Sequence, residues 1–401
     1  MTALMLSLMC SGCNKQIADT DGIMPSAPAD PIQLTKAEES VNSAANAFGL
    51  DVFRKINETK GINQMFISPL SLSLAMAMTA TGADGETEAQ MMRVMGFDGC
   101  TSREMGGYFK KMSTTLLGID PSTTLEIANA IWVDKHITLN PEYVRDVKDW
   151  YSSEASSEDM NSPATIKKIN GWCSDHTSGK INGILDENDK GIVTLLANAL
   201  YFKGTWMQKF ERTFDGKFKG ISGKVSKAKM MSLTRDLKYS KNAGWSMVEL
   251  PYGNGAFLMD VLLPDGSFKD GVAGLDTKAW ETLTDGLRTG NIHVEMPAFK
   301  MDYTIELKEI LISLGMKDAF SGAADFSRMS SSPMSIDFVR QKTFVDVNEN
   351  GTEAAAVTAI GMKLTSAGPA FTIDFIADRP FVYAIREAST GAIIFIGQKV
   401  D

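Results

Sequence analysis

The sequence predicts an α+β fold with antiparallel or mixed sheets. Helical periodicity dominates the first half of the chain, and strand patterns enter later without the strand–helix–strand alternation of a parallel sheet. The C-terminal part is the richest in strand patterns, which cover 335–347, 371–376, 381–387 and 392–400. No internal repeat or low-complexity tract interrupts this progression.

Several predicted helices carry their own start signals. Thr35 and Glu38 form a capping box at the first of them. The second begins with Ser68 as N-cap and Pro69 at the first helical position. It is apolar nearly all round, so it must be buried on most sides. Helices are expected at 34–58, 68–81, 86–94, 103–117, 141–150, 163–178 and about 275–288.

Strand patterns in the middle of the chain point to a buried sheet. The segment 125–133 alternates as a strand does, and 191–202 is a continuous apolar run that is short for a helix. Such a run is typical of a central strand covered on both faces. From 214 to 300, short strands alternate with turns, one of them at Pro251-Tyr252-Gly253.

Composition and charge exclude some classes of function. The 401 residues are 44% hydrophobic and 22% charged, which is enough for one large domain or two smaller ones. A net charge of −9 argues against a nucleic-acid partner, because phosphate binding needs a clustered positive field. No internal apolar run approaches the ~18–20 residues of a membrane-spanning helix.

The N-terminus resembles the end of a bacterial lipoprotein signal. Residues 1–13 are apolar and end in small residues before Cys13, which is the expected lipid anchor, ahead of Cys10. The basic start of such signals is missing, and the alternative is a short disordered tail. The polar, proline-containing segment 14–33 is expected to be a flexible tether. An exported protein anchored in the bacterial envelope, periplasmic or surface-exposed, follows from this reading.

No motif of an enzyme, metal site or cofactor site stands out. The histidines lie in no HExxH motif, and no phosphate-binding glycine loop is present. Cys173 and His176 lie three residues apart on one predicted helix face, which leaves a hydrolase with this pair as a rival hypothesis. Cys100 and Cys173 form no paired framework, so both are expected to be free thiols.

The segment 349–369, ENGTEAAAVTAIGMKLTSAGP, is the most unusual stretch. It has few of the residues that hold loops in turns, and almost nothing larger than threonine occurs before Ile360. Thr352, Ala354, Ala356 and Thr358 would share one face of a strand. The pattern therefore predicts a loop that can become a strand.

Six blocks in order resemble the serpin family, over about 35–400 of the chain. They are 63–92, 125–143, 169–185, 194–206, 349–360 and 375–398. The resemblance implies one domain over 34–401, with three β-sheets, about nine helices and an exposed reactive-centre loop at about 350–370. It also implies a monomer that needs no cofactor. The mechanism that the resemblance implies is that a target protease attacks the loop and forms an acyl-enzyme. The cleaved loop would then insert into the main sheet and distort the protease.

The resemblance assigns a hinge to the start of this loop. Its residues are Glu349, Gly351, Thr352, Glu353, Ala354, Ala355 and Ala356. Members of the family that have lost inhibition typically carry bulky or charged residues here. In this chain the inward positions are small, and the charge of Glu353 falls on the opposite face from Thr352. An inhibitory serpin is therefore expected, with a non-inhibitory serpin-fold binding protein as the alternative.

Other site residues follow from the same resemblance. They belong to the shutter and breach regions of the main sheet and are Ser68, Ser71, Asn198, Trp206 and Gln341. Gln341 stands where the family usually has a histidine that bonds the asparagine at 198. A glutamine amide can both donate to and accept from Asn198, but it brings no pH sensitivity.

The family's usual loop length predicts the bond that the protease cleaves. Counting from Glu349 gives Thr365-Ser366, and counting back from the C-terminal block shifts this by one residue. Thr365 suits elastase- or subtilisin-like proteases, and Leu364 before it suits papain-like enzymes. Lys363-Leu364 is the trypsin-like alternative.

Overall fold

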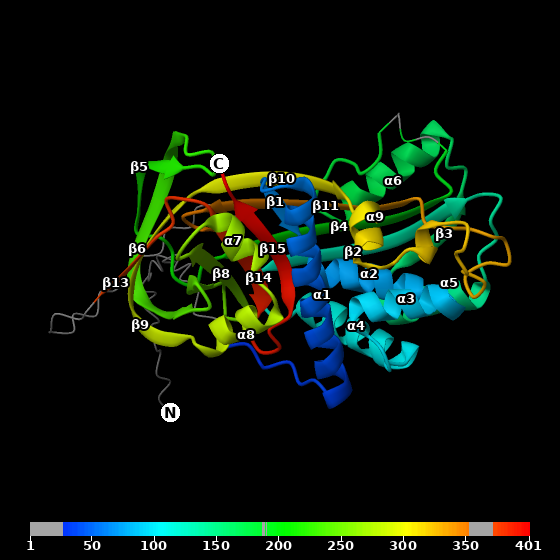
Figure 1. Ribbon diagram of the computed structural model, residues 1–401, viewed down its shortest axis with the longest axis horizontal. Coiled ribbons are helices and arrows are strands. Elements are labelled where there is room, and N and C mark those ends of the chain that lie inside the picture. The colour runs from blue at the N-terminus through cyan, green and yellow to red at the C-terminus, as the bar shows by residue number, and fades with distance from the viewer. Residues whose placement is uncertain (1–26, 187–188, 190, 353–371) are drawn as a thin grey trace, which may run out of the picture.

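The computed structural model describes residues 27–186, 189, 191–352 and 372–401 (Figure 1). The leader 1–13 with Cys13, most of the predicted tether, hinge residues 353–356 and both candidate cleavage sites lie outside these residues. The described part of the tether, 27–33, contacts the body of the protein. There the Ile32 amide donates to Ser389 Oγ at 2.9 Å, and Lys111 Nζ donates to the Gln33 carbonyl at 3.1 Å.

Nine α-helices and one 3₁₀ helix occur in the described residues, and seven of the α-helices lie close to predicted positions. The helices are α1 (Lys36–Lys60), α2 (Pro69–Thr81), α3 (Gly85–Met95), α4 (Ser102–Leu116), α5 (Pro141–Tyr151), α6 (Pro163–Asp175), α7 (Phe268–Ala273), α8 (Thr277–Asp285), α9 (Lys308–Leu314) and η1 (Asp318–Phe320). The Thr35/Glu38 capping box and the Ser68 cap both form as predicted. Helix α6 ends three residues earlier than expected, and α7 and α9 are too short to show a helical period.

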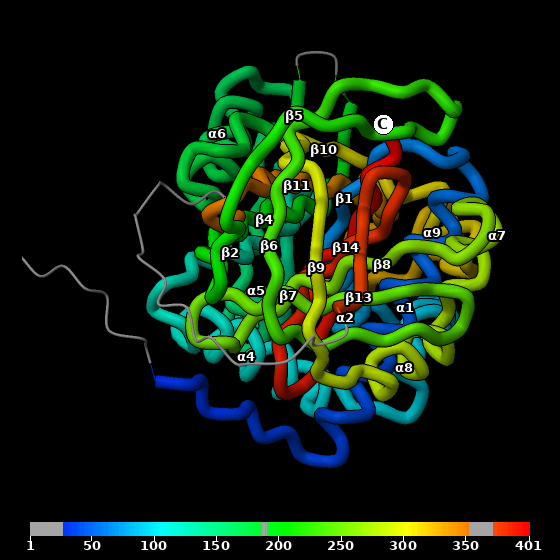
Figure 2. The backbone as a smooth tube through the Cα atoms, turned by 90° about the vertical axis from the view of Figure 1, so that its left-hand side faces the viewer, coloured from blue at the N-terminus to red at the C-terminus, as the bar shows by residue number. Residues whose placement is uncertain are grey.

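A nine-stranded sheet contains most of the later strands. They are β1 (Met65–Ile67), β5 (Arg212–Lys219), β6 (Val225–Asn242), β7 (Trp245–Pro251), β8 (Phe257–Pro264), β9 (Arg288–Pro297), β13 (Ile373–Ile376), β14 (Phe381–Glu387) and β15 (Ile393–Lys399). Their order is β1-β15-β14-β8-β7-β6-β9-β13, with β5 paired to β6. Figure 2 shows β9 between β6 and β13.

Three sheets were expected, and the described residues form two hydrogen-bonded sheets because strand β6 joins two of the three. It has 18 residues, and its first part pairs with β5 and β9. Its last residues, from Lys238 to Asn242, pair with β7, while Lys238 and Tyr239 still pair with β9 as well. The two halves of the nine-stranded sheet therefore share this strand. If these two halves are counted as separate sheets, the six-stranded sheet is the third, and the total equals the three sheets that were expected.

The six-stranded sheet, called the main sheet below, is mixed. Its strands are β10 (Phe299–Glu306), β11 (Phe338–Asn348), β12 (Gly351–Thr352), β4 (Thr194–Thr205), β2 (Thr124–Asp134) and β3 (Glu154–Glu158), in that order. Strands β11 and β4 also pair directly and in parallel. As predicted, β4 is central and nearly wholly buried.

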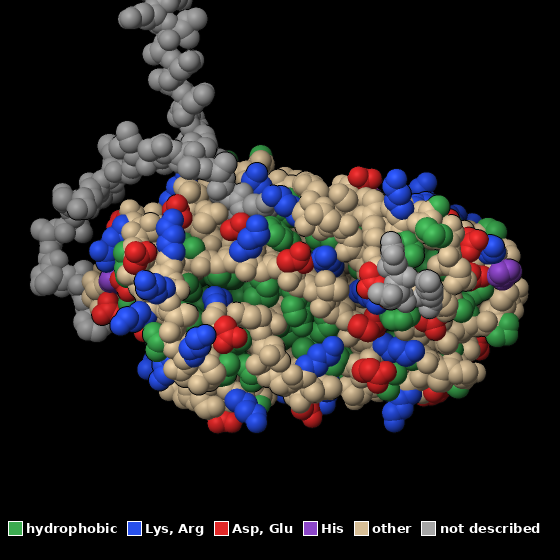
Figure 3. Space-filling view, turned by 90° about the horizontal axis from the view of Figure 1, so that it is seen from above, with side chains coloured by type: hydrophobic (Ala, Val, Ile, Leu, Met, Phe, Trp, Pro, Cys, Tyr) green, Lys and Arg blue, Asp and Glu red, His purple; other side chains and the backbone are tan. Residues whose placement is uncertain are grey.

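Two hydrophobic cores lie on the two faces of the main sheet. The larger one includes nearly all of α2, whose residues Pro69–Ala80 are buried as its all-round apolar pattern predicts. The smaller one includes Trp132 and Tyr201 of the sheet and Ile169 and Cys173 of α6. On the side where α6 lies, hydrophobic side chains gather in the middle and charged ones surround them (Figure 3). In the described residues, no helix is long and apolar enough to cross a membrane.

Candidate functional site: the seam between β11 and β4

The seam between β11 and β4 is already open at one end. The two strands pair directly from Phe338 to Phe344 on β11. Beyond that point β12 lies between them and is antiparallel to both: Thr352 is opposite Val347 and Gly204, and Gly351 is opposite Asn348 and Thr205. Gly351 and Thr352, the third and fourth residues of the predicted strand-forming segment 349–369, are therefore part of the main sheet.

Thr352 is buried on the core side of the seam and is completely inaccessible to solvent. Its Oγ1 lies 2.7 Å from Tyr252 Oη, so the two hydroxyls share a hydrogen bond. The Tyr252 ring stacks on Trp206 with ring centroids 4.3 Å apart. Trp206 Nε1 in turn donates to the Asn348 carbonyl at 2.8 Å. The structure thus brings hinge residue Thr352 and breach residue Trp206 together around a tyrosine.

Tyr252 was missed by the sequence analysis, which assigned it to a turn. It does lie at a turn, but it also forms a β-bridge with Trp206 and is fully buried. Burial raises the pKa of its hydroxyl, which therefore stays protonated and able to donate. Only an aromatic residue between Pro251 and Gly253 hinted at this role.

Gly351 is required here for two reasons. Its backbone φ of +152° is one that residues with a side chain rarely adopt. In addition, a Cβ at this position would lie 2.0 Å from the Gly204 carbonyl oxygen. The preceding residues are held by backbone bonds. The Phe210 amide donates to the Glu349 carbonyl at 3.1 Å, and the Trp206 amide donates to the Asn350 carbonyl at 3.0 Å. The described part of the hinge is therefore docked into the sheet.

The predicted shutter residues meet where the two strands pair directly. Gln341 and Asn198 are register partners across the seam. The side chain of Gln341 bonds the backbone of Ser68 twice. Its Oε1 accepts from the Ser68 backbone amide at 2.8 Å, and its Nε2 donates to the Ser68 carbonyl at 3.1 Å. Its contact with Asn198 Oδ1 is longer, at 3.5 Å, so Gln341 mainly ties β11 to the start of α2.

Asn129 of β2 completes this network and was not singled out from the sequence. Its Oδ1 accepts from Asn198 Nδ2 and from Ser71 Oγ, both at 2.8 Å. All these side chains are buried, and none of them titrates. The signal for Asn129 was a single asparagine within the apolar run from Ile127 to Val133.

The rival hydrolase pair is not supported by its surroundings. Cys173 is fully buried, and burial raises the pKa of its thiol to about 12. A nucleophilic cysteine needs the opposite, namely access and a lowered pKa. His176 is exposed, with Nδ1 2.9 Å from the Trp172 carbonyl. Both described cysteines are free thiols, as expected. The described residues contain no cluster of groups that could hold a metal ion.

The site is thus a six-stranded mixed sheet in which the short strand β12 lies between β11 and β4 at one end of their seam. Residues 43–401 match the family model described as "Serpin (serine protease inhibitor)". The chain belongs to the serpin family. Its general activity is accordingly that of a protease inhibitor rather than an enzyme.

Relatives and solved structures support this assignment. The chain is 34% identical to the leukocyte elastase inhibitor of Xenopus laevis over 379 residues, which cover 90% of this chain and 99% of the relative. It is 31% identical to an uncharacterized serpin-like protein of Thermococcus kodakarensis, covering 96% and 91%. The crystal structure of the thermophilic serpin tengpin in the native state superposes with a TM-score of 0.83 at 29% identity, covering 94% and 97%.

Proposed function

We propose that this serpin is a suicide-substrate inhibitor that traps a serine endopeptidase by inserting its cleaved loop along the seam. The observation that carries the proposal is β12, because Gly351 and Thr352 already occupy the position of an inserted strand. Cleavage of the loop beyond the hinge would free the residues that follow Thr352 to continue the same strand.

The register of the seam supports continued insertion. If β12 is extended with unchanged pairing, residue 358 lies opposite Gln341 on β11 and opposite Asn198 on β4. These two residues are themselves register partners in the closed part of the seam. One inserted strand can therefore pair with both neighbours without a shift. Even-numbered residues would share the inward face of Thr352, and those up to Thr358 are alanine or threonine.

The energy available from insertion is large. About 14 inserted residues would add on the order of 14 backbone hydrogen bonds, each with a net worth of ~0.5–1.5 kcal/mol, or roughly 7–20 kcal/mol in all. A typical domain is stable by only ~5–15 kcal/mol. Insertion can thus hold a protease in a distorted form.

The target class follows from the cleavage site. Thr365-Ser366 remains the proposed bond, with an elastase- or subtilisin-like target, and the elastase-inhibitor names of several relatives agree with that choice. Lys363-Leu364 would instead select a trypsin-like protease. A papain-like enzyme reading Leu364 is the third option.

The test is to incubate the protein with elastase, subtilisin, trypsin and papain separately. We expect an SDS-resistant complex with one of them, and mass spectrometry of the released C-terminal fragment identifies the cleaved bond. Clean loop cleavage with full recovery of every protease would contradict inhibition and favour the non-inhibitory binding protein.

We also propose that Cys13 carries a lipid and anchors the inhibitor to the bacterial envelope. The apolar residues before it support this. Mass spectrometry of the N-terminal peptide from the native host tests the proposal. A lipid-sized mass increase on Cys13 is expected, and an unmodified peptide that begins before Cys13 would contradict it.

A further inference from the structure

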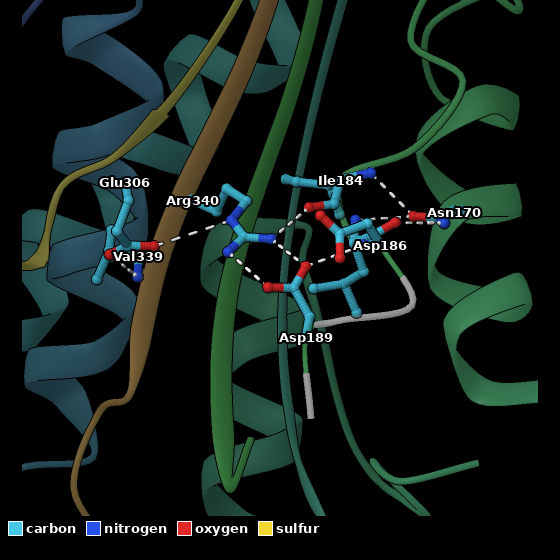
Figure 4. A network of polar contacts seen from close by, with 8 residues as sticks. Asn170, Ile184, Asp186, Asp189, Glu306, Val339 and Arg340 are labelled. Carbon is cyan, nitrogen blue, oxygen red and sulfur yellow. Dashed lines mark hydrogen bonds and ion pairs between the residues drawn. The ribbon is translucent and has the colours of Figure 1, made fainter. Parts of the chain in front are cut away.

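The end of the seam away from β12 is fastened by a charged contact on the α6 side of the main sheet (Figure 4). Arg340 of β11 forms an ion pair with Asp189, which lies in the segment that leads from α6 into β4. Arg340 Nη1 donates to Asp189 Oδ2 at 2.6 Å, and Nη2 donates to Asp189 Oδ1 at 3.1 Å. Nη1 also donates to the Ile184 carbonyl at 2.8 Å. These contacts of Arg340 with Asp189 and Ile184 are called the clasp below.

The clasp is a strong form of ion pair. A guanidinium that bonds both carboxylate oxygens is bidentate and charge-assisted. Arg340 and Asp189 are only 14% and 13% exposed, so water screens the pair little. Burial raises the pKa of Asp189, but the hydrogen bonds from Arg340 and the Asp186 amide, with the Arg340 charge, outweigh it and bring the pKa below its usual value. Asp189 is therefore ionised at neutral pH.

Each side of the clasp is anchored to a different part of the sheet. On the β11 side, Arg340 Nε lies 3.9 Å from Glu306 Oε2 on the neighbouring strand β10. On the other side, Asn170 of α6 holds the segment: its Oδ1 accepts from the amides of Ile184 and Leu185 at 2.8 and 3.0 Å. Asn170 Nδ2 donates back to the Leu185 carbonyl at 2.8 Å. The clasp thus connects β10 and β11 to α6 and the entry to β4.

Insertion of a strand must break or carry along this connection. With the register of β12 continued, residue 359 would lie between Arg340 and Ala197 of β4. Two strands that admit a third between them move apart by about 4.8 Å. Hydrogen bonds of 2.6–3.1 Å cannot span that movement while the Asp189 segment stays with α6 and β4.

We propose that Arg340 and Asp189 are the residues that keep the seam closed beyond β12, and that breaking the clasp limits the rate of full insertion. The clasp would hold the uncleaved loop at Thr352 and prevent its premature insertion. This inference rests on the proposed function, because it assumes that the seam is the path of the loop.

The test measures opening of the seam without a protease. A fluorescent synthetic peptide with the sequence of residues 352–363 is incubated with the intact protein, and stable incorporation is followed on native gels. Arg340→Met and Asp189→Asn should each raise the rate of incorporation by at least about 10-fold, equivalent to about 1.4 kcal/mol of barrier. The double variant should be no faster than the faster single one, because both changes remove the same contact.

Two further variants serve as controls. Arg340→Lys keeps the charge but cannot bridge both carboxylate oxygens, so an intermediate rate is expected. Arg93→Met removes an exposed ion pair with Glu86 on α3, 52% and 60% exposed, and should leave the rate unchanged. Thermal melts followed by circular dichroism confirm that each variant is folded.

The outcomes separate the two proposals. If Arg340→Met and Asp189→Asn both incorporate the peptide at the wild-type rate, the proposed role of the clasp is wrong and the loop-insertion mechanism still stands. Failure of the peptide to enter any variant, wild type included, would overturn both. If Arg340→Met proves unfolded, Asp189→Asn alone decides, because it keeps the shape of the side chain and removes only its charge.

Discussion

The two ends of the β11–β4 seam are held by different chemistry. At the β12 end, small neutral groups meet: Thr352 shares a hydroxyl bond with Tyr252, and Gly351 fills a space that no side chain could enter. At the other end the strands pair directly, and a charged clasp joins Arg340 to Asp189 across them. Between these ends lies an uncharged hydrogen-bond network around Gln341. Under the proposed mechanism, this difference would allow insertion to begin in the intact protein and yet stop.

The largest effect is expected from Thr352→Arg, which breaks the open end. The side chain would carry a charge into a site that is completely buried beside Tyr252, where an unpaired charge costs several kcal/mol. The variant should be cleaved as a substrate and should form no SDS-resistant complex. Thr352→Ser is the matched control, because it keeps the hydroxyl. Undiminished trapping by Thr352→Arg would refute insertion of the hinge.

Asn129→Ala should destabilise the middle of the seam. Its Oδ1 accepts from both Ser71 and Asn198, and its removal leaves two buried donors unpaired at about 1–3 kcal/mol each. We expect the free energy of unfolding in urea to fall by roughly 2–6 kcal/mol on this basis. Asn182→Ala, at an exposed position, should change it by less than about 0.5 kcal/mol. Equal urea-unfolding midpoints for the two variants would contradict the view that this hydrogen-bond network stabilises the seam.

Tyr252→Phe should loosen the docked hinge without unfolding the protein. The change leaves Thr352 Oγ1 without this partner, at a cost of about 1–3 kcal/mol. Hydrogen exchange at the amides of Gly351 and Thr352 should then speed up by about tenfold or more, since 1.4 kcal/mol is a factor of ten. Exchange at β15 residues serves as the internal control. Unchanged exchange at the hinge would show that the hydroxyl contact does not hold β12.

Gln341→His would add a pH dependence that the wild-type shutter lacks. The groups around Gln341 are the Ser68 backbone and Asn198, which do not titrate. A histidine buried among them would have a folded pKa below its unfolded value of about 6.5. Unfolded chains then bind more protons, so the variant should lose stability relative to wild type as the pH falls through about 6.5. Parallel stability curves between pH 5 and 8 would contradict this.

The smallest effect is expected from acid on the clasp. The folded pKa of Asp189 is lowered, so its contribution is complete above the unfolded value of about 3.9 and is lost as the pH falls through the folded pKa. The difference in peptide incorporation between wild type and Asp189→Asn should therefore be constant from pH 5 to 8 and should shrink only below about pH 4. Burial raises the pKa of nearby Glu306, but Glu306 is present in both proteins and its effect cancels. A difference that disappears near pH 6 would assign the effect to another group.

Local signals predicted most of the elements correctly. Thr35 with Glu38 and Ser68 with Pro69 start their helices because caps and first-turn prolines act within a few residues of the chain. The apolar run of β4 likewise marks a strand that is covered on both faces. In contrast, α7 and α9 are too short to show a period, and the sharing of β6 by two halves of a sheet depends on which strands pair with each part of it.

The sequence by itself led to the prediction that 349–369 can serve as a loop or a strand. Small side chains and a glycine at 351 are local properties of the chain, and burial of Thr352 agrees with them. Only the tertiary structure decided how the seam is held, through Tyr252 against Thr352 and Arg340 against Asp189. These partners are 100 and 151 residues apart in the chain. No local pattern links residues at such separations, because their contact arises only when the strands pair and α6 packs on the sheet.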